Sequence, residues 1–401
     1  MITINELFSG IGAQVAALKR LGVEYETVGI SEIDRFAIQS YEAINGKTRN
    51  YGDISKVEAL DYADLWTYSF PCTDISLAGK QEGLTDKTGK QTRSGLLFEV
   101  ERLLKKSVED GNQPKYLLLE NVKNLVGKKF KPEFDKWLKT LDSLGYNNYW
   151  KVLNAKDYGV PQNRERVFVV SIRKDVDTHG YTFPKPLKLE RRLKDVLETN
   201  VDEKFYLKQD LAKSFVERLS ERDVSNTIRC GGAGSVDKKH TLDLVVASTQ
   251  KNAYKGSTDG SYPLTAAMGM GGGQIPMIVN GGNKNFSQHT QNSVAEPFVL
   301  EKGIGHNPVS KKFEFDGFHE NKPCPTLLAT DYKCPKCYSD GVRIRKLTPK
   351  ECWRLMDFTD EEFEAAEKAG VSKTQLYKQA GNSIVVSVLS GIFNNLLGEK
   401  K

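Results

Sequence analysis

The first 190 or so residues alternate short apolar runs with stretches of helical periodicity, and this alternation constrains the fold more than any other feature of the chain. Such alternation is typical of an α/β protein with a parallel sheet covered by helices. One helix is predicted over Ala13–Leu21, where Val15, Leu18 and Leu21 share a face. Strands are predicted over Ile2–Phe8, Glu26–Ile33, Ala63–Phe70, Tyr116–Glu120 and Arg166–Arg173.

The composition and periodicity of the sequence change near residue 191 and change back near residue 343. The middle segment is rich in Gly, Asn, Ser and Thr, and its short apolar runs, such as Leu242–Ala247 and Pro276–Val279, are typical of strands between turns. Helical periodicity returns over Thr348–Met356 and Thr374–Leu397. We therefore expect one α/β domain from residues 1–190 plus 343–401, interrupted by a loop-rich insert at 191–342.

Composition limits the setting in which the chain works. Its formal charge of +6 permits a polyanionic partner without requiring one. No run of about 18 apolar residues and no basic leader are present, so we expect a cytoplasmic protein that does not span a membrane. The cysteines follow no framework spacing and are expected to be reduced. Cys334 and Cys337 lack a second pair of ligands nearby, so no metal is expected.

A possible nucleotide site lies where the first three strand regions end. Phe8-Ser9-Gly10-Ile11-Gly12 forms a glycine-rich strand-to-helix turn, which can bring backbone N–H groups to a ligand or be purely structural. It differs from the dinucleotide fingerprint, which disfavours a nicotinamide enzyme. Glu32 ends the second strand and could bind ribose hydroxyls, and Asp53 follows in a third loop. Each carboxylate alone would more often be a helix cap or lie in a solvated turn, but their order along successive strand ends favours an adenosyl ligand.

Reactive side chains also follow the predicted strands. Cys72 comes directly after a strand and Pro71, where ligands of open α/β sheets bind. A buried, inert cysteine is the alternative. Glu120 follows the next strand, and Arg164 and Arg166 precede another. A thiol, an acid and two guanidinium groups at one sheet edge are what nucleophilic catalysis on a polarised ring requires.

In its ordered motifs the chain resembles DNA (cytosine-5)-methyltransferases of the bacterial or phage type. The resemblance covers nearly all of the chain except the insert. It is carried by Leu-Phe-Ser-Gly-Ile-Gly at 7–12, Glu32, Gly-Asp-Ile at 52–54, Phe-Pro-Cys at 70–72, Gly-Leu-Leu-Phe at 95–98, Glu-Asn-Val-Lys-Asn at 120–124, Gln-Asn-Arg-Glu-Arg at 162–166, Arg-Lys-Leu-Thr-Pro-Lys-Glu-Cys at 345–352 and Gly-Asn-Ser at 381–383. It implies a Rossmann-like sheet that binds S-adenosyl-L-methionine (SAM) and an insert that recognises the target DNA.

The resemblance also implies catalytic roles. Cys72 matches the nucleophile that adds to C6 of a flipped cytosine, and Glu120 matches the acid that contacts N3 and the exocyclic amine. Arg166 matches the guanidinium near O2 of the base, and Arg164 is expected to support the catalytic loop or bind a phosphate. The segment Thr73–Gly95 resembles the mobile loop that closes over the base, although Thr73-Asp74 departs from the family's frequent glutamine after the cysteine.

For the cofactor, the resemblance implies a pocket built from several loops. Phe8 is expected to stack near the adenine, Glu32 to bind the ribose and Asp53 to bind the adenine amine. Ile33 stands where the family often has tryptophan, which weakens the expected stacking. The other residues expected to line the pocket are Ser9, Gly10, Ile11, Gly12, Ile54, Pro71, Leu97 and Asn382.

Two alternatives remain open at this point. One is the tRNA-methylating branch that shares this scaffold, which the long insert disfavours. The other is a catalytically inactive relative that regulates through DNA binding, which the complete set of catalytic residues disfavours. The partner implied by the resemblance is double-stranded DNA, bound by a monomer, with a cognate restriction endonuclease as a functional rather than physical partner.

Overall fold

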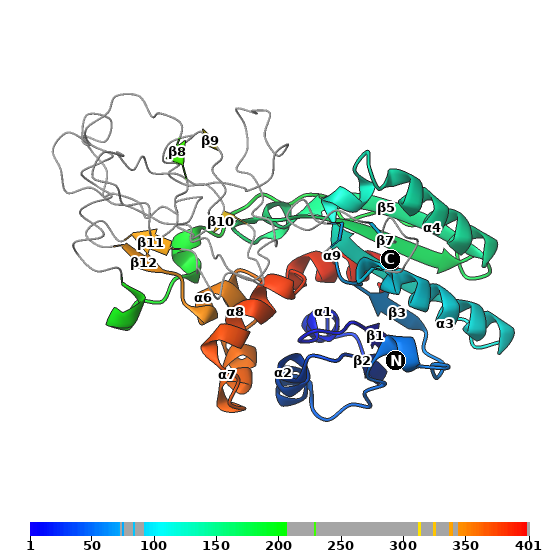
Figure 1. The fold of residues 1–401 in the computed structure, drawn as a ribbon, viewed down its shortest axis with the longest axis horizontal. Helices are drawn as coiled ribbons and strands as arrows, with labels where there is room; N and C mark the ends of the chain where they lie inside the picture. Colours follow the sequence, from blue (N-terminus) through cyan, green and yellow to red (C-terminus); the bar gives the residue numbers. More distant parts are fainter. Residues whose placement is uncertain are drawn as a thin grey trace.

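The computed structural model of the chain describes residues 1–72, 74, 75, 83, 84, 92–206, 228–229, 312–313, 324–325, 337–339 and 344–398. Its centre is a six-stranded sheet with the strand order β2-β1-β3-β4-β7-β5 (Figure 1). The strands are β1 (Ile2–Leu7), β2 (Tyr25–Ser31), β3 (Leu65–Tyr68), β4 (Tyr116–Val122), β5 (Tyr146–Asn154) and β7 (Glu165–Arg173). The predicted α/β fold class is confirmed.

The sheet is mixed rather than wholly parallel as predicted. Strands β1 to β4 pair in parallel, but β7 runs antiparallel to both β4 and β5. Strand β5 was not predicted, because its sequence Tyr-Asn-Asn-Tyr-Trp-Lys-Val-Leu-Asn lacks a continuous apolar run. The connection from β5 to β7 is short and contains no crossover helix, so the two strands must be antiparallel.

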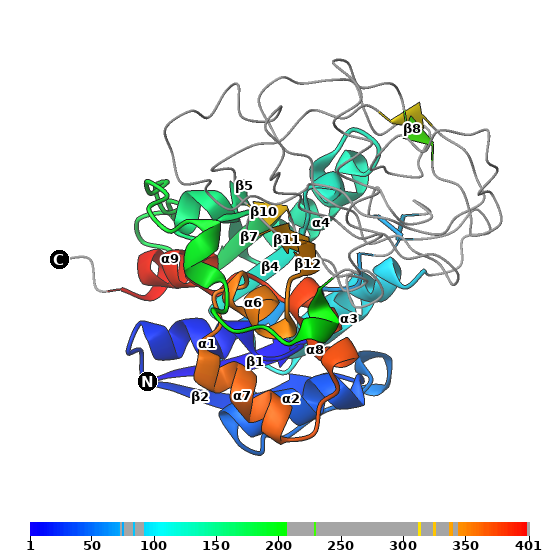
Figure 2. The same ribbon diagram turned by 90° about the vertical axis from the view of Figure 1, so that its left-hand side faces the viewer.

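Helices cover both faces of the sheet and bury two separate apolar clusters. One cluster lies under α3 (Leu97–Glu109) and α4 (Lys131–Ser143). The other brings α1 (Ala13–Arg20) together with the C-terminal helices α6 (Pro349–Arg354), α7 (Asp360–Lys368), α8 (Lys373–Asn382) and α9 (Val386–Leu397). Helix α2 (Arg35–Asn45) lies beside α7, as both views show (Figures 1 and 2).

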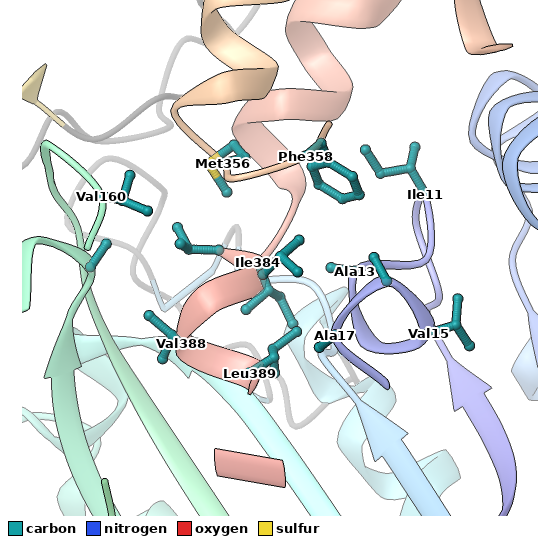
Figure 3. Packing of buried hydrophobic residues seen from close by; sticks show 14 of the residues in the cluster. Ile11, Ala13, Val15, Ala17, Val160, Met356, Phe358, Ile384, Val388 and Leu389 are labelled. Carbon is teal, nitrogen blue, oxygen red and sulfur yellow. The ribbon is translucent and has the colours of Figure 1, made fainter. Parts of the chain in front are cut away.

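The C-terminal segment folds back onto the start of the chain. Helix α9 packs against α1, and in Figure 3 Ile384 and Leu389 lie on the side that faces Ala13 and Ala17 of α1, whereas Val388 points to the opposite side. The sequence predicted one helix over Thr374–Leu397, and the structure corrects this. The backbone is extended at Ser383 and Val385, so α8 and α9 are separate helices. The Gly-Asn-Ser sequence at 381–383 has weak helix propensity, which permits the break.

Among the described residues, one segment (Lys373–Leu397) is long and apolar enough to pass a test for membrane-spanning helices. In the fold this segment is divided between α8 and α9. Helix α9 has 12 residues, fewer than a membrane span needs, and its apolar face lies in the core. The hydropathy of the segment is therefore explained by core packing.

The two chain segments that lead into and out of the insert are joined by a buried polar cluster. Arg345 forms a two-pronged ion pair with Glu351, with N–O distances of 2.7 and 2.9 Å. The backbone N–H of Glu198 donates to the same carboxylate at 2.8 Å, and Arg354 donates to the carbonyl of Val196 at 3.1 Å. The base of the insert is thus fixed to the α/β domain. The predicted strands Leu242–Ala247 and Pro276–Val279 and the Cys334 position lie outside the described residues.

Candidate active site

The turn after β1 is held in an unusual backbone conformation. Phe8, Gly10 and Gly12 all have positive φ angles, of 60°, 58° and 83°. A Cβ atom on Gly12 would lie 2.7 Å from Asn45 Nδ2 and 2.9 Å from the Tyr41 ring, so glycine is required there on two grounds. The residues that sequence analysis assigned to a ligand turn therefore form a tight, left-handed turn at the end of the strand.

Glu32 closes this turn from the end of β2. Its Oε2 accepts a hydrogen bond from the Gly10 N–H at 2.9 Å, and its Oε1 accepts from the N–H groups of Ile33 and Asp34 at 2.8 Å. The structure therefore brings the first two predicted cofactor segments together. The side chain of Ile33 is 73% exposed beside them.

Asn50 joins the third segment to the first two, and sequence analysis missed it. Its side-chain amide donates to the Glu32 carbonyl at 3.0 Å, and its Oδ1 accepts from the N–H groups of Glu32 and Gly52. Asp53 follows and accepts from the Ser55 N–H at 3.0 Å and the Ser55 hydroxyl at 2.8 Å, which hold the pKa of Asp53 below its usual range. Asp53 therefore also serves as a turn cap. An asparagine two residues before Gly52-Asp53 carries no distinctive sequence signal.

The other predicted cofactor residues differ in how they are presented. Ile11, Ile54 and Leu97 are at most 3% exposed and pack in the apolar clusters, so they shape the turn and its surroundings from within. Pro71 is half-buried, and Asn382 is exposed at the end of α8. Ser9 is buried, and its hydroxyl has no hydrogen-bond partner among the described residues.

Cys72 lies just beyond β3 and is half-buried. Two asparagines, one near the end of β4 and one just after it, hold its segment in place. Asn121 donates to the Phe70 carbonyl at 3.1 Å, and Asn124 donates to the Ile75 carbonyl at 2.5 Å. Both asparagines belong to the motif at 120–124, but the sequence alone predicted no role for them. They attach the cysteine segment to the strand that carries Glu120.

The ends of the loop that begins at Cys72 are also joined. The N–H of Asp74 donates to the Ser94 hydroxyl at 3.1 Å, and the N–H of Ser94 donates to the Asp74 carboxylate at 3.2 Å. Asp74, two residues after Cys72, thus closes the base of the loop. Most of the predicted mobile segment between them lies outside the described residues.

Glu120 and Arg166 meet on one face of the sheet. In the antiparallel pairing of β4 and β7, Val122 is opposite Arg166 and Glu120 is opposite Phe168. Glu120 and Arg166 are therefore diagonal neighbours, and Arg166 Nε lies 3.2 Å from Glu120 Oε1. Burial raises the pKa of Glu120, and the positive charges of Arg166 and Arg164 oppose that rise.

The charges around Cys72 act on its thiol in opposite directions. Burial raises the pKa of Cys72, and Glu120 adds to the rise, whereas Arg166 and Arg164 lower it. A neutral thiol is therefore favoured at rest, and the two guanidinium groups stabilise the thiolate once it forms.

Arg164 is buried and faces the C-terminal segment. Its Nη2 donates to the carbonyls of Gly381 and Ser383 at 3.1 and 2.7 Å, and its backbone N–H donates to Asn154 at 3.1 Å. Only 4% of the residue is exposed. This geometry supports the α8–α9 break and leaves the guanidinium enclosed by protein rather than presented to a phosphate.

The site suits an adenosyl cofactor and shows no metal centre. A left-handed turn, an adjacent carboxylate and the buried Ser9 hydroxyl, which has no partner within the described part of the chain, are groups that suit a polar nucleoside ligand. Within the described part of the chain no three His, Cys, Asp or Glu side chains are grouped to hold a metal ion.

The mixed six-stranded sheet, flanked by helices on both faces, is consistent with a Rossmann-like methyltransferase fold. The chain belongs to the C-5 cytosine-specific DNA methylase family, whose family model matches residues 2–398. It is a DNA cytosine methyltransferase, and enzymes of this family use SAM as the methyl donor.

Relatives of this chain come from bacteria and phages. It is 33% identical to the orphan methyltransferase M.SPBetaI of Bacillus phage SPbeta, over 99% of this chain and 97% of the relative. It is 32% identical to the type II methyltransferase M2.ScrFI of Lactococcus lactis subsp. cremoris, over 99% of both chains. The fold is similar to that of the S. pombe Dnmt2 methyltransferase, with a TM-score of 0.56 at 17% identity over 99% of this chain and 98% of the other.

Proposed function

We propose that the chain methylates C5 of a flipped cytosine in double-stranded DNA through a covalent bond between Cys72 and C6. The observation that carries this proposal is the convergence of Cys72, Glu120 and Arg166 at one sheet edge, with Glu120 and Arg166 3.2 Å apart. Cytosine C5 is a weak nucleophile, so the ring must first be activated. A base stacked in a duplex cannot reach this site, so it must leave the helix.

In the first step the Cys72 thiol loses its proton to solvent, the thiolate forms a bond to C6, and the electrons of the C5–C6 double bond become available at C5. Glu120, whose pKa is raised by burial, donates a proton to N3 as negative charge develops on the ring. Arg166 holds Glu120 in place and presents its guanidinium to O2 of the base. SAM, when bound, supplies the methyl group as a sulfonium electrophile.

In the second step the proton on C5 leaves to solvent and the C6–Cys72 bond breaks, which restores the double bond and frees the thiolate to take up a proton again. Glu120 then receives the N3 proton back, so the enzyme ends in its starting state. Asn121 and Asn124 keep the cysteine segment aligned throughout, because both donate to its backbone carbonyls.

The cofactor pocket follows from the same arrangement. Phe8, Ser9, Gly10 and Gly12 supply the turn, Glu32 the ribose-binding carboxylate, and Asp53 a polar contact to the adenine. Arg164 acts as a positioning residue, since its guanidinium is enclosed and donates to the C-terminal backbone. Asn382, exposed beside those carbonyls, completes the pocket.

The insert at 191–342 is proposed as the target-recognition domain, and residues 1–190 plus 343–401 as the catalytic domain. Every proposed catalytic and cofactor residue lies outside the insert, which supports this division. Leu193 and Val196 are buried in the core of the α/β domain, so the part of the insert free to vary begins after them. We further infer a monomer acting in the cytoplasm of a bacterial host, with a restriction endonuclease as a functional partner.

The test is a covalent trap. Fluorine at C5 cannot leave as a cation, so duplex DNA containing 5-fluorocytosine should hold the enzyme as a stable adduct, visible as a shifted band on a denaturing gel. The adduct should require SAM and should be absent in Cys72→Ser, because serine is a far weaker nucleophile. Cys352→Ser is the matched control, since Cys352 is buried in the core away from the proposed site.

The outcomes separate the alternatives. An adduct that persists in Cys72→Ser would exclude Cys72 as the nucleophile. An adduct with 5-fluorocytosine tRNA but with no DNA would favour the RNA-methylating branch. No adduct on randomised DNA, with SAM binding intact, would favour the DNA-binding regulator.

A further inference from the structure

One buried acid has no part in the chemistry proposed above. Glu6, on β1 two residues before the cofactor turn, is fully buried, and burial raises its pKa to about 7. Its Oε2 has no hydrogen-bond partner among the described residues. Burial of a carboxyl group costs free energy unless its oxygens are hydrogen-bonded, so the position of Glu6 calls for an explanation.

The contacts of Glu6 lead back to the turn. Glu6 Oε1 accepts a hydrogen bond from the Tyr41 hydroxyl at 2.5 Å. The backbone N–H of Val15, in the first turn of α1, and the charge of Lys19 also stabilise its ionised form. Glu6 therefore joins α2, through Tyr41, to the N-terminus of the helix that follows the turn.

Tyr41 touches the turn itself. Its ring lies so close to Gly12 that any Cβ there would be 2.9 Å from it. Tyr41 is itself fully buried, so its hydroxyl and its ring are both fixed. One side chain thus contacts Glu6 at its tip and Gly12 along its edge.

The turn needs support on both sides because three of its five residues have a left-handed backbone conformation. This conformation is strained at Phe8, which is not a glycine. Glu32 holds the solvent side through the Gly10 N–H. We propose that Glu6 and Tyr41 form a positioning pair that holds the buried side of the Phe8–Gly12 turn in the conformation that binds SAM. This inference rests on the proposed location of the cofactor pocket.

Tyr41→Phe tests the pair with the least disturbance, because it removes the hydroxyl and keeps the ring against Gly12. Calorimetric titration of the full-length protein with SAM, well below its unfolding temperature, should show affinity reduced by about 5- to 20-fold. Tyr146→Phe is the matched control. Tyr146 is also fully buried and donates one hydrogen bond, to the Pro114 carbonyl at 2.7 Å, but it lies at the start of β5. Its loss should lower the melting temperature without changing SAM affinity.

A conservative series at Glu6 gives the second measurement. Glu6→Gln keeps an acceptor for the Tyr41 hydroxyl and should bind SAM within about threefold of the unmodified protein, whereas Glu6→Leu should lose at least tenfold. DNA affinity in the absence of SAM should be unchanged in both.

Wild-type SAM affinity in Tyr41→Phe would overturn the pairing, as would equal losses in Tyr41→Phe and Tyr146→Phe, which would indicate a general loss of stability. The pocket assignment is tested separately by Glu32→Ala. If Glu32→Ala weakens SAM binding and Tyr41→Phe does not, the positioning pair fails and the pocket stands. If Glu32→Ala has no effect, the pocket itself is misplaced.

Discussion

Arg166 Nε lies 3.2 Å from Glu120 Oε1, and the side chains are 15% and 10% exposed. The pair is formed across two antiparallel strands and lies beside the thiol of Cys72, whose pKa both residues influence. An acid held this way can exchange a proton with a substrate while its charge is balanced by a fixed guanidinium. The reactivity of Cys72 therefore depends on the electrostatic field of Glu120 and Arg166 together.

Glu120→Gln tests the acid. The amide keeps the shape of the side chain but cannot donate and recover a proton, so formation of the 5-fluorocytosine adduct should slow by about 10²–10⁴-fold. Quench-flow sampling followed by denaturing electrophoresis measures the rate. SAM affinity should be unchanged, and a rate within threefold of wild type would remove Glu120 from the proton transfer.

Arg164→Lys and Arg166→Lys compare the two guanidinium groups. Lysine cannot reproduce the donation from Arg164 to the Gly381 and Ser383 carbonyls, so Arg164→Lys should lower the free energy of unfolding by about 1–3 kcal/mol. Arg166→Lys should instead slow methyl transfer, because it loosens Glu120. Urea unfolding and single-turnover kinetics separate the two effects. The reverse pattern would contradict the assignment of Arg164 as a positioning residue.

Glu32→Ala should reduce SAM affinity. The carboxylate supports the Gly10, Ile33 and Asp34 N–H groups and is proposed to bind the ribose, so its loss should cost about 1.5–3 kcal/mol of binding free energy. Glu32→Gln, which retains one acceptor oxygen, should lie between Ala and wild type. Isothermal titration with SAM measures both, and an unchanged affinity for Glu32→Ala would argue against this pocket.

Exchange of the insert tests the domain division. Replacing residues 207–342 with the corresponding segment of a relative that has another target should redirect methylation and keep SAM affinity, because Glu198 and Arg345 remain to fix the base of the segment. Bisulfite sequencing of a plasmid from cells that express the chimaera reports the target. Continued methylation of the original sequence would show that recognition residues lie in the α/β domain.

Glu6 should make stability depend on pH in a defined window. Burial raises the pKa of Glu6 to about 7 in the folded protein, from an ordinary value of 4.5, so the folded state binds more protons between these values. The free energy of unfolding that Glu6 contributes is therefore greatest at low pH, and up to about 3 kcal/mol of it is lost as pH rises through this window. Glu6→Gln does not titrate, so its stability relative to wild type should increase from pH 4.5 to 8. Urea unfolding at both pH values measures the difference, and a constant difference would mean that Glu6 stays in one protonation state.

Much of the site was predictable because its residues lie in short local motifs. The Phe8–Gly12 turn, Glu32, Cys72 and Glu120 each follow an apolar run, and the carboxyl ends of parallel strands meet at one edge. Strand β5 was not predicted because polar residues interrupt its apolar ones. Asn50 was not predicted because it belongs to no recognisable motif. Asp53 lies in a family motif, and its side chain also caps a turn, which is the alternative role that the sequence had left open.

The sequence by itself determined the α/β fold class, most strands of the sheet, the chemical groups available and the family to which the chain belongs. The tertiary structure decided which of these groups meet. The diagonal contact of Glu120 with Arg166 depends on the antiparallel register of β7, and the contact of Arg164 with Ser383 joins residues 219 positions apart. The Glu6–Tyr41 contact depends on how α2 packs on β1. Local propensity acts over a few residues, whereas these contacts exist only after distant segments have packed together.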